Sequence, residues 1–379
     1  MKISVRFSRI KILYFLTLLT VYLFPVGISS QDQDRTIHFP DVEGYMTLKC
    51  DFHIHTVFSD GLVWPTIRVD EAVMDGLDAI ALTEHIEYQP WKDDILHTDR
   101  NRSYHIARKA AIAHDLLVIH GTEITRNMPP GHANALFVTD VNELILSDSV
   151  EVYKRAVEQG AFIFWNHPNW ISQEKDGIPQ LSEIHKYFIE NGMLHGIEVV
   201  NDITFSEEAL RIANDHGLTV MGTSDIHGLV DYQFDIANGG HRPITLVLAD
   251  VKSESAIKEA LFAGRTITWF NDILAGKEEH LTMLMDSCLI FKNKGYIGSS
   301  DVMEVEIENR SDARFFLNNI SPYDFYKNND LIEVLPQSTE TINVLTKRAD
   351  PSSVPLKFKV MNAVFNYKET IEMEHWLMN

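Results

Sequence analysis

The chain has 379 residues, of which 45% are hydrophobic and 23% are charged. This composition is ordinary for a folded protein, so it excludes disorder along the whole chain and leaves room for one large and one smaller domain. The formal net charge is -21 at pH 7. Such an acidic surface repels a phosphate backbone, so nucleic acid is not expected as a partner.

Residues 1 to 30 have the layout of a secretory signal peptide. Four basic residues precede an apolar run over residues 12 to 24, and small residues follow at Gly27, Ser29 and Ser30. An uncleaved membrane anchor is the alternative, but the run is shorter than the ~20 residues that cross a bilayer. Cleavage would remove those four positive charges, taking the net charge from -21 to -25. We expect an exported protein, periplasmic or extracellular, without stable membrane insertion once the signal is removed.

A linker over residues 31 to 45 leads into a region, residues 46 to 275, where short apolar runs alternate with amphipathic stretches. The expected strands are Met46–His53, Asp78–Leu82, Leu116–Ile124, Ala133–Val138, Ala161–Trp165, Gly196–Val200, Leu218–Gly222 and Pro243–Leu248. Helical patterns lie between several of them, at Pro65–Met74, Arg102–His114, Val150–Glu158, Leu181–Glu190, Glu207–Asp215 and Ser255–Phe262. The alternation indicates a parallel sheet covered by helices. Seven or eight units favour a closed barrel, although spacing alone leaves an open sheet possible.

The pattern changes over residues 276 to 379, where short β-like runs are separated by clusters of Asn, Asp, Ser, Pro and Gly. The expected strands are Leu281–Phe291, Val302–Glu308, Phe315–Asn318, Glu340–Leu345 and Leu356–Met361. No stretch here has a convincing helical pattern, so we expect a small all-β domain of the sandwich type. The two cysteines, Cys50 and Cys288, fall in different predicted domains. They are compatible with one disulfide or with two buried thiols, and their spacing does not suggest a zinc site.

Histidines and carboxylates recur at the ends of the predicted strands. His53 and His55 are two residues apart on the first strand, so their side chains point to the same face and can bind one ion. The same region and the later strand ends supply seven more candidate metal ligands, Asp60, His85, Glu123, His132, His167, Asp225 and His227. The carboxyl ends of barrel strands meet at one mouth. Mixed imidazole and carboxylate ligands suit zinc, manganese or iron better than calcium.

These motifs resemble the successive signature motifs of the polymerase and histidinol phosphatase (PHP) family. The motifs are His53-x-His55, Ser59-Asp60-Gly61, Thr83-Glu84-His85, Gly121-Thr122-Glu123, Gly131-His132, Asn166-His167-Pro168 and Ser224-Asp225-Ile226-His227. The resemblance covers roughly residues 46 to 270. It implies a distorted (β/α)7 barrel and a centre of three divalent metal ions.

The resemblance also implies how the ligands are shared. It places His53, His55, Glu123 and Asp225 around one ion, Glu123, His132 and His167 around a second, and Asp60, His85 and His227 around the third. Three close cations lower the pKa of a bridging water, so that hydroxide can attack a small-molecule phosphoester without an organic cofactor. Asp225 and His227 are the expected catalytic residues that assist the leaving group, a role carried over from the family.

Residues outside the ligand set bear on the substrate. Arg126, His241 and Arg242 lie near strand ends, where a cationic side chain would pair with phosphate. Trp165, Trp170 and Tyr88 are candidates for an apolar wall. The runs His241–Val247, Gly264–Thr266 and Asn343–Thr346 are similar to exported bacterial PHP phosphodiesterases, which favours a diester. A phosphomonoesterase, a metal-dependent ester or lactone hydrolase, and a non-catalytic exported binding protein remain as alternatives.

Overall fold

Short, fully buried strands form the centre of the N-terminal part of the protein. The structure, a computed structural model, describes residues 35–95, 97–347 and 353–378, so the predicted signal peptide lies outside the described residues. The strands of this part are β1 (Met46–Ile54), β2 (Ala79–Leu82), β3 (Leu117–Ile124), β4 (Ala133–Leu136), β5 (Phe162–Trp165), β6 (Gly196–Asn201), β7 (Thr204–Phe205), β8 (Thr219–Thr223), β9 (Ile244–Ala249), β10 (Thr266–Phe270) and β11 (Ile273–Gly276). Strands β2, β5 and β9 are buried at every position. Continuous apolar sequence is what burial on both faces requires.

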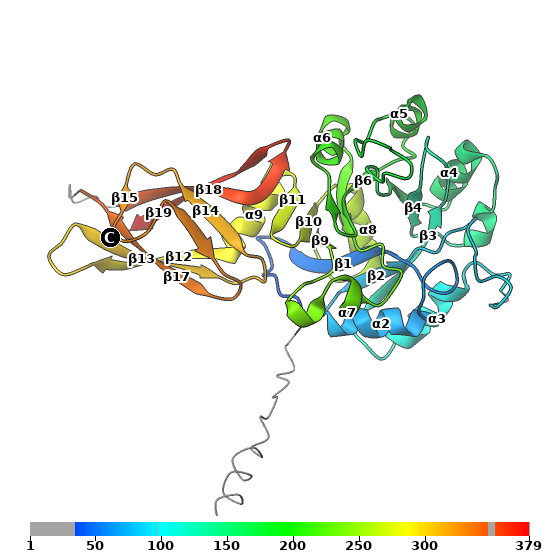
Figure 1. Cartoon of the computed structure of the whole chain (residues 1–379), viewed down its shortest axis with the longest axis horizontal. Coiled ribbons are helices and arrows are strands. Elements are labelled where there is room, and N and C mark those ends of the chain that lie inside the picture. Colours follow the sequence, from blue (N-terminus) through cyan, green and yellow to red (C-terminus); the bar gives the residue numbers. More distant parts are fainter. Residues whose placement is uncertain (1–34, 96, 348–352, 379) are drawn as a thin grey trace, which may run out of the picture. The chain divides into compact units, whose positions relative to one another are not determined.

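Helices follow most of these strands and cover the sheet (Figure 1). They are α2 (Pro65–Met74), α3 (Arg102–Ala111), α4 (Ser149–Glu158), α5 (Glu183–Glu190), α6 (Glu207–His216), α7 (Val230–Gln233) and α8 (Glu254–Phe262), with 3-10 turns η1 (Val141–Leu144) and η2 (Ile236–Asn238). Several begin at a side chain that caps free backbone N–H groups. Asp148 accepts from Val150 and Glu151, and Ser206 accepts from the backbone N–H of Ala209. Such caps fix where a helix begins.

The strand order from β9 is β9, β1, β2, β3, β4, β5, β6, with β8 paired to β6. The predicted parallel arrangement holds for β1, β2 and β3 and for β5, β6 and β8. It is wrong for β4 and β9, which run antiparallel to both of their neighbours. Between β3 and β4 the chain reverses through a loop without a crossover helix, so the two strands must be antiparallel.

The sheet closes into a distorted barrel where β8 meets β1, β9 and β10 without a regular ladder. Ile54 and Ile226 form an isolated parallel bridge, and the Thr245 hydroxyl donates to the Gly222 carbonyl oxygen at 2.7 Å. A Cβ at Gly222 would overlap the Thr268 side chain, with Oγ1 only 1.7 Å away. The closure therefore depends on glycine at this position.

The described residues of the C-terminal region form strands apart from one helix, which confirms the predicted two-part fold class. Its strands are β12 (Leu289–Tyr296), β13 (Val302–Asn309), β14 (Phe315–Asn319), β15 (Asp324–Phe325), β16 (Leu331–Val334), β17 (Thr339–Leu345), β18 (Ser353–Asn366) and β19 (Glu369–Met378). Strands β12, β13, β17 and β15 form one sheet, while β16, β14, β18 and β19 continue the sheet of the barrel through a parallel pairing of β18 with β11. Phe291 and Phe358 stack between the two sheets, as in a sandwich.

One element of this region was predicted wrongly. The run Leu281–Phe291 was expected to be a strand, but helix α9 occupies Glu278–Cys288 and β12 begins only at Leu289. Leu281, Leu284, Met285 and Cys288 are buried, and this spacing is that of one face of a helix. Two glutamates in the first turn favour a helix start as well.

Both cysteines are buried and free, so the alternative of two buried thiols is the one that the structure has. None of the helices among the described residues combines the length and the apolar character needed to cross a lipid bilayer.

Candidate metal centre

All nine predicted ligands lie at the same end of the barrel. His53 lies near the end of β1 and His55 directly follows this strand. Asp60 lies in the next loop, and His85 follows β2. The remaining ligands belong to β3 or flank β4, β5 and β8, namely Glu123, His132, His167, Asp225 and His227. His132 precedes its strand instead of following it. Because β4 is antiparallel, its amino end lies at the mouth, which explains why a residue that opens a strand joins the cluster.

The histidines and carboxylates form three overlapping groups, and within each group the potential ligand atoms lie within 4.8 Å of one another. In the first group, Asp225 Oδ1 is 3.2 Å from His53 Nε2 and 3.1 Å from His55 Nε2. In the second, Glu123 is 3.0 Å from His85 Nδ1 and 2.8 Å from His132 Nδ1. These separations are short enough for one cation to be shared within each group.

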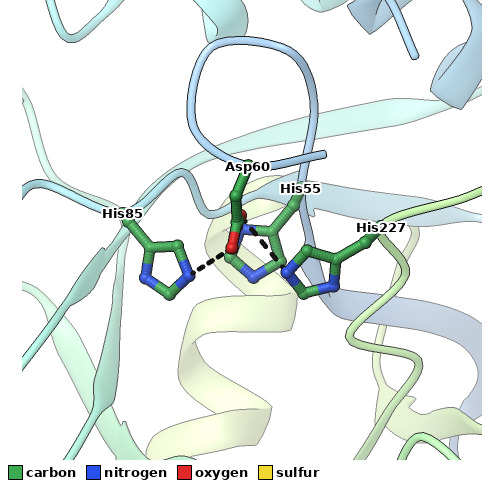
Figure 2. A group of neighbouring side chains, drawn as sticks. All are labelled: His55, Asp60, His85 and His227. Atoms are coloured by element: carbon green, nitrogen blue, oxygen red, sulfur yellow. Dashed lines mark ion pairs between the residues drawn. The ribbon is translucent and has the colours of Figure 1, made fainter. Parts of the chain in front are cut away.

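The third group surrounds the Asp60 carboxylate, which Figure 2 shows pointing between two imidazoles. Asp60 Oδ1 is 3.2 Å from His227 Nε2, and Oδ2 is 3.4 Å from His85 Nε2. His55 completes the group, and its ring stacks on that of His227 with 4.3 Å between centroids. His55 and His85 each belong to two groups, so neighbouring cation positions share ligands.

Glu123 lies at the centre of the cluster and is 0% exposed. Its Oε2 lies 3.3 Å from the Nε2 atoms of both His53 and His55, while Oε1 faces His132 and, at 3.6 Å, His167 Nε2. A carboxylate with one oxygen toward each side has the geometry of a bridging ligand. The arrangement differs from the predicted sharing in three respects, because His85 joins the second group, His55 also joins the third, and His167 lies beside the second group.

The electrostatics of the cluster suit cations. Burial opposes ionisation of Glu123, but the imidazoles of His85, His53 and His132 outweigh it and hold its pKa well below the usual range. Burial disfavours the charged form of His53 too, yet Asp225, Glu198 and Glu123 raise its pKa well above normal. The neighbouring imidazoles also lower the pKa of Asp225 and of Asp60, so the ionised carboxylates of Glu123, Asp225 and Asp60 draw positive charge into the site.

Two buried atoms of the cluster, His55 Nε2 and Asp60 Oδ1, make no hydrogen bond of regular geometry. Each lies beside another candidate ligand atom, Asp225 Oδ1 at 3.1 Å and His227 Nε2 at 3.2 Å. Buried polar atoms almost always have a well-formed hydrogen bond, so its absence at candidate ligand atoms is what a metal site predicts. The residues present therefore fit divalent cations, both in the chemistry of their donor atoms and in these unsatisfied positions.

The backbone at two of the ligands has positive φ, 49° at Asp225 and 29° at His167. Residues other than glycine rarely adopt this region, and such strain is concentrated at functional sites. At Asp225 this backbone conformation directs the carboxylate toward His53 and His55, and the following residue, Ile226, forms the bridge to Ile54 at the end of β1.

Sequence reasoning missed the residues that orient the ligands. Glu198 on β6 lies 2.8 Å from His53 Nδ1 and accepts a hydrogen bond from the Thr223 hydroxyl at 2.5 Å. Asn166 Nδ2 donates to Glu123 Oε1 at 3.0 Å. Such partners fix the tautomer and direction of a ligand. A lone glutamate inside the apolar run Gly196–Val200 was the available signal, since a buried carboxylate needs a partner.

A cavity of about 450 Å³ opens onto the cluster. Beyond the candidate ligands its lining consists of apolar and polar side chains, Asn169, Trp170, Ile171, Asn201, Asp202, Thr204 and Gln233. The lining residues include no lysine and no arginine. Trp170 takes the predicted place in the wall, with its ring 5.1 Å from that of His167.

The predicted substrate-binding residues do not line this cavity. Arg242 is 1% exposed and its guanidinium pairs with Asp75 and Asp51, so its prediction is wrong because two buried carboxylates already hold it. His241 stacks on Trp269 at 3.5 Å between ring centroids and bonds to backbone carbonyls instead.

Arg126 is bound to Glu87 and to the Leu146 carbonyl oxygen, which leaves it outside the lining as well. Two of the predicted wall residues also lie elsewhere. Trp165 is buried in the core, where it stacks on His185, and Tyr88 is exposed at the surface near His85.

Comparison with known proteins agrees with this fold and this cluster. A two-domain protein of Bacteroides vulgatus ATCC 8482, described as containing a predicted PHP-like metal-dependent phosphoesterase, is 38% identical, with a TM-score of 0.84 over 90% of this chain and 98% of that chain. The chain belongs to this family of PHP-like metal-dependent phosphoesterases. Residues 289–375 match the model of an Ig-like domain family, and we call this region the Ig-like domain.

More distant proteins match about half of the chain. A protein of Bifidobacterium adolescentis ATCC 15703, assigned as a metal-dependent phosphoesterase, is 20% identical with a TM-score of 0.38 over 47% of this chain and 87% of that chain. A protein of uncharacterised function from Methanocaldococcus jannaschii is 27% identical over 203 residues, 49% of this chain and 86% of its own length.

Proposed function

We propose that this phosphoesterase hydrolyses small organic phosphodiesters at a centre of three divalent cations. The observation that carries the proposal is the cavity, which joins the cluster of histidines and carboxylates to a wall without a lysine or arginine side chain. Bound manganese, zinc or iron ions would supply a water of lowered pKa and positive charge opposite the phosphoryl oxygens. The residues of the chain supply position, proton transfer and room for the ester arms.

Hydrogen bonds within the cluster leave the ring nitrogens free where ligands are needed. His227 Nδ1 donates to the Asp225 carbonyl oxygen at 2.7 Å, which leaves its Nε2 lone pair directed toward Asp60. His53 Nδ1 donates to Glu198 in the same way, and its Nε2 faces Glu123 and Asp225. A ring that donates through one nitrogen offers the other as a ligand.

We propose that Asp225 and His227 assist the departure of the leaving group. Both line the cavity, and the His227 side chain is 37% exposed, more than the other candidate ligands in the cluster. A group at the rim can reach a departing alkoxide that is not yet solvated.

The charge of the wall favours a diester over a monoester. A diester carries one negative charge and two organic arms, whereas a monoester carries up to two negative charges and profits from cationic side chains. Here Asp202 adds a carboxylate to the wall, while Trp170 and Ile171 offer apolar surface. An ester with an aromatic or apolar arm and no second phosphate fits this environment.

The test is a substrate panel with the metal-loaded protein. We expect kcat/KM for an aryl alkyl phosphodiester to exceed that for the matching aryl phosphate at least tenfold, a barrier difference of about 1.4 kcal/mol. Trp170→Ala should lower kcat/KM for the aryl diester about tenfold without changing the metal content, whereas Trp376→Ala, an exposed tryptophan of the C-terminal domain, should change neither.

Other outcomes of the panel contradict the proposal in different ways. A preference for the monoester rejects the diester assignment but keeps the phosphoesterase. Faster hydrolysis of carboxylic esters or lactones places the activity in another class. Metal binding without turnover on any substrate of the panel supports a non-catalytic binding protein.

A further inference from the structure

Helix α2 (Pro65–Met74) carries a charged pair on its buried side. Arg68 and Glu71 are buried together with Val69 and Ala72, which pack in the core. A guanidinium and a carboxylate lose hydration when they are buried, and burying them is favourable only if hydrogen bonds replace the lost water. The hydrogen-bond partners of Arg68 and Glu71 therefore indicate the role of the pair.

Arg68 uses its guanidinium to hold backbone carbonyl groups at two ligand-bearing segments. Nε donates to the His55 carbonyl oxygen at 2.9 Å. One terminal nitrogen, Nη2, donates to the carbonyl oxygens of Ile226 at 3.1 Å and His227 at 2.9 Å. The planar guanidinium fixes the direction of every donor at once, so the three carbonyl groups are held in one arrangement.

Glu71 holds the guanidinium in place and extends the same contact. Its Oε2 accepts from Arg68 Nη1 at 2.7 Å, and its Oε1 accepts from the backbone N–H of Val230 at 3.0 Å. The pair thus ties α2 to the chain on both sides of Gly228, where the loop leaves β8 for α7 (Val230–Gln233).

His55 and His227 belong to segments that share no regular ladder. The isolated bridge between Ile54 and Ile226 joins them, and Ser224 donates hydrogen bonds to Asp51 farther from His227. The His227 carbonyl oxygen also accepts from the backbone N–H of Leu62 at 2.8 Å. Yet His55 and His227 must converge with Asp60 in one candidate cation group, and small shifts of a peptide plane would move the imidazole away from it.

We propose that Arg68, fixed by Glu71, is a positioning residue that sets the distance between His55 and His227 and thereby forms the cation position at Asp60. The inference rests on the proposed metal-dependent function, since it assigns a task to a pair that touches no substrate. It goes beyond the ligand set because the pair contributes no ligand atom and acts only through backbone carbonyl groups.

The charge of the pair makes the test decisive. Arg68→Met removes a positive charge that contacts the backbone of His55 and His227, and by Coulomb's law alone this would strengthen cation binding. Weaker binding in this variant can then arise only from lost geometry. We expect its affinity for the weakest-held Mn²⁺ to fall about 10- to 100-fold, the range seen when residues that orient metal ligands are removed, and kcat to recover as Mn²⁺ is raised.

Two further variants keep the test informative if Arg68→Met folds poorly. Arg68→Lys retains the charge but not the planar set of donors, and we expect a smaller loss of Mn²⁺ affinity with the same recovery. Arg242→Met is the matched control, because Arg242 is equally buried but bonds to the side chains of Asp75 and Asp51. It should lower the melting temperature while leaving the Mn²⁺ dependence of kcat unchanged.

The outcomes separate this inference from the proposed function. If the parent binds Mn²⁺ and the Arg68 variants bind it equally well, or if Arg242→Met shows the same Mn²⁺ loss, the positioning role is contradicted and the function stands. If the parent binds no divalent cation, the proposed function fails and the positioning role fails with it.

Discussion

The mouth of the barrel and the Ig-like domain bury side chains of opposite character. At the mouth, His53, His55 and Glu123 are buried against one another. In the Ig-like domain, the fully buried positions include Phe315 and Phe358, and buried residues alternate with partly buried ones along most of β13 and β18. Packed apolar side chains stabilise a fold directly, whereas buried charged groups require partners.

The comparison teaches that the two regions serve different purposes. The Ig-like core gains stability from dispersion and the loss of apolar surface to water. The mouth keeps ionised carboxylates beside imidazoles, an arrangement that gains most when cations bind. Substitutions in the first region should therefore change stability, and substitutions in the second should change metal binding and turnover.

The largest effect is expected from removing a candidate ligand. Asp225→Ala or His53→Ala should lower kcat/KM about a thousandfold or more, a loss of ~4 kcal/mol in transition-state stabilisation, with a folded protein by circular dichroism. His105→Ala, at an exposed position outside the cluster, is the control and should keep parental activity. Near-normal turnover of Asp225→Ala with unchanged metal content would show that the cluster is not the active site.

A smaller effect, confined to stability, is expected in the Ig-like domain. Phe358→Ala removes a ring that packs against Phe291 and Phe325, so unfolding should become easier by ~3–5 kcal/mol. Calorimetry would measure the lower melting temperature, and metal content and kcat at 25 °C should stay at parental values. Loss of metal from folded Phe358→Ala would mean that the two regions are coupled.

A pH effect of up to about 3 kcal/mol is expected from His120, on β3 but outside the cluster. Burial, with a contribution from His105, lowers its pKa from 6.5 to about 4. The unfolded chain therefore binds more protons between pH 6.5 and 4, so His120 makes the protein lose stability as the pH falls through this window. Above pH 6.5 the His120 imidazole is neutral in both the folded and the unfolded chain, so this loss of stability is absent.

Replacing His120 with phenylalanine keeps an aromatic ring against Tyr104, on which His120 stacks at 4.0 Å. The melting temperature of His120→Phe should fall less between pH 7 and 4.5 than that of the parent, measured at one metal concentration. His114→Phe, at an exposed site, should follow the parent. Equal slopes for all three proteins would contradict the assignment to His120.

Much of the fold followed from local patterns. Apolar runs such as Phe162–Trp165 and capped helices such as Ser149–Glu158 are defined by periodicity and by the residues at their ends. Helix α9 was misread as a strand because a short run rich in Leu and Met fits both periods, and packing of Leu281, Leu284 and Met285 decided between them.

The sequence by itself determined the family and the candidate ligands, because each ligand motif is local and stands at the end of a predictable strand. Only the tertiary structure decided which partners Arg242 and Arg68 bind. Arg68 lies on α2 and Arg242 just before β9. Arg242 pairs with Asp75 and Asp51, whereas Arg68 donates hydrogen bonds to the carbonyl groups of His55 and His227. A guanidinium can reach many partners, and its choice depends on charges and carbonyl groups brought close by chain segments more than 150 residues apart, which no local pattern records.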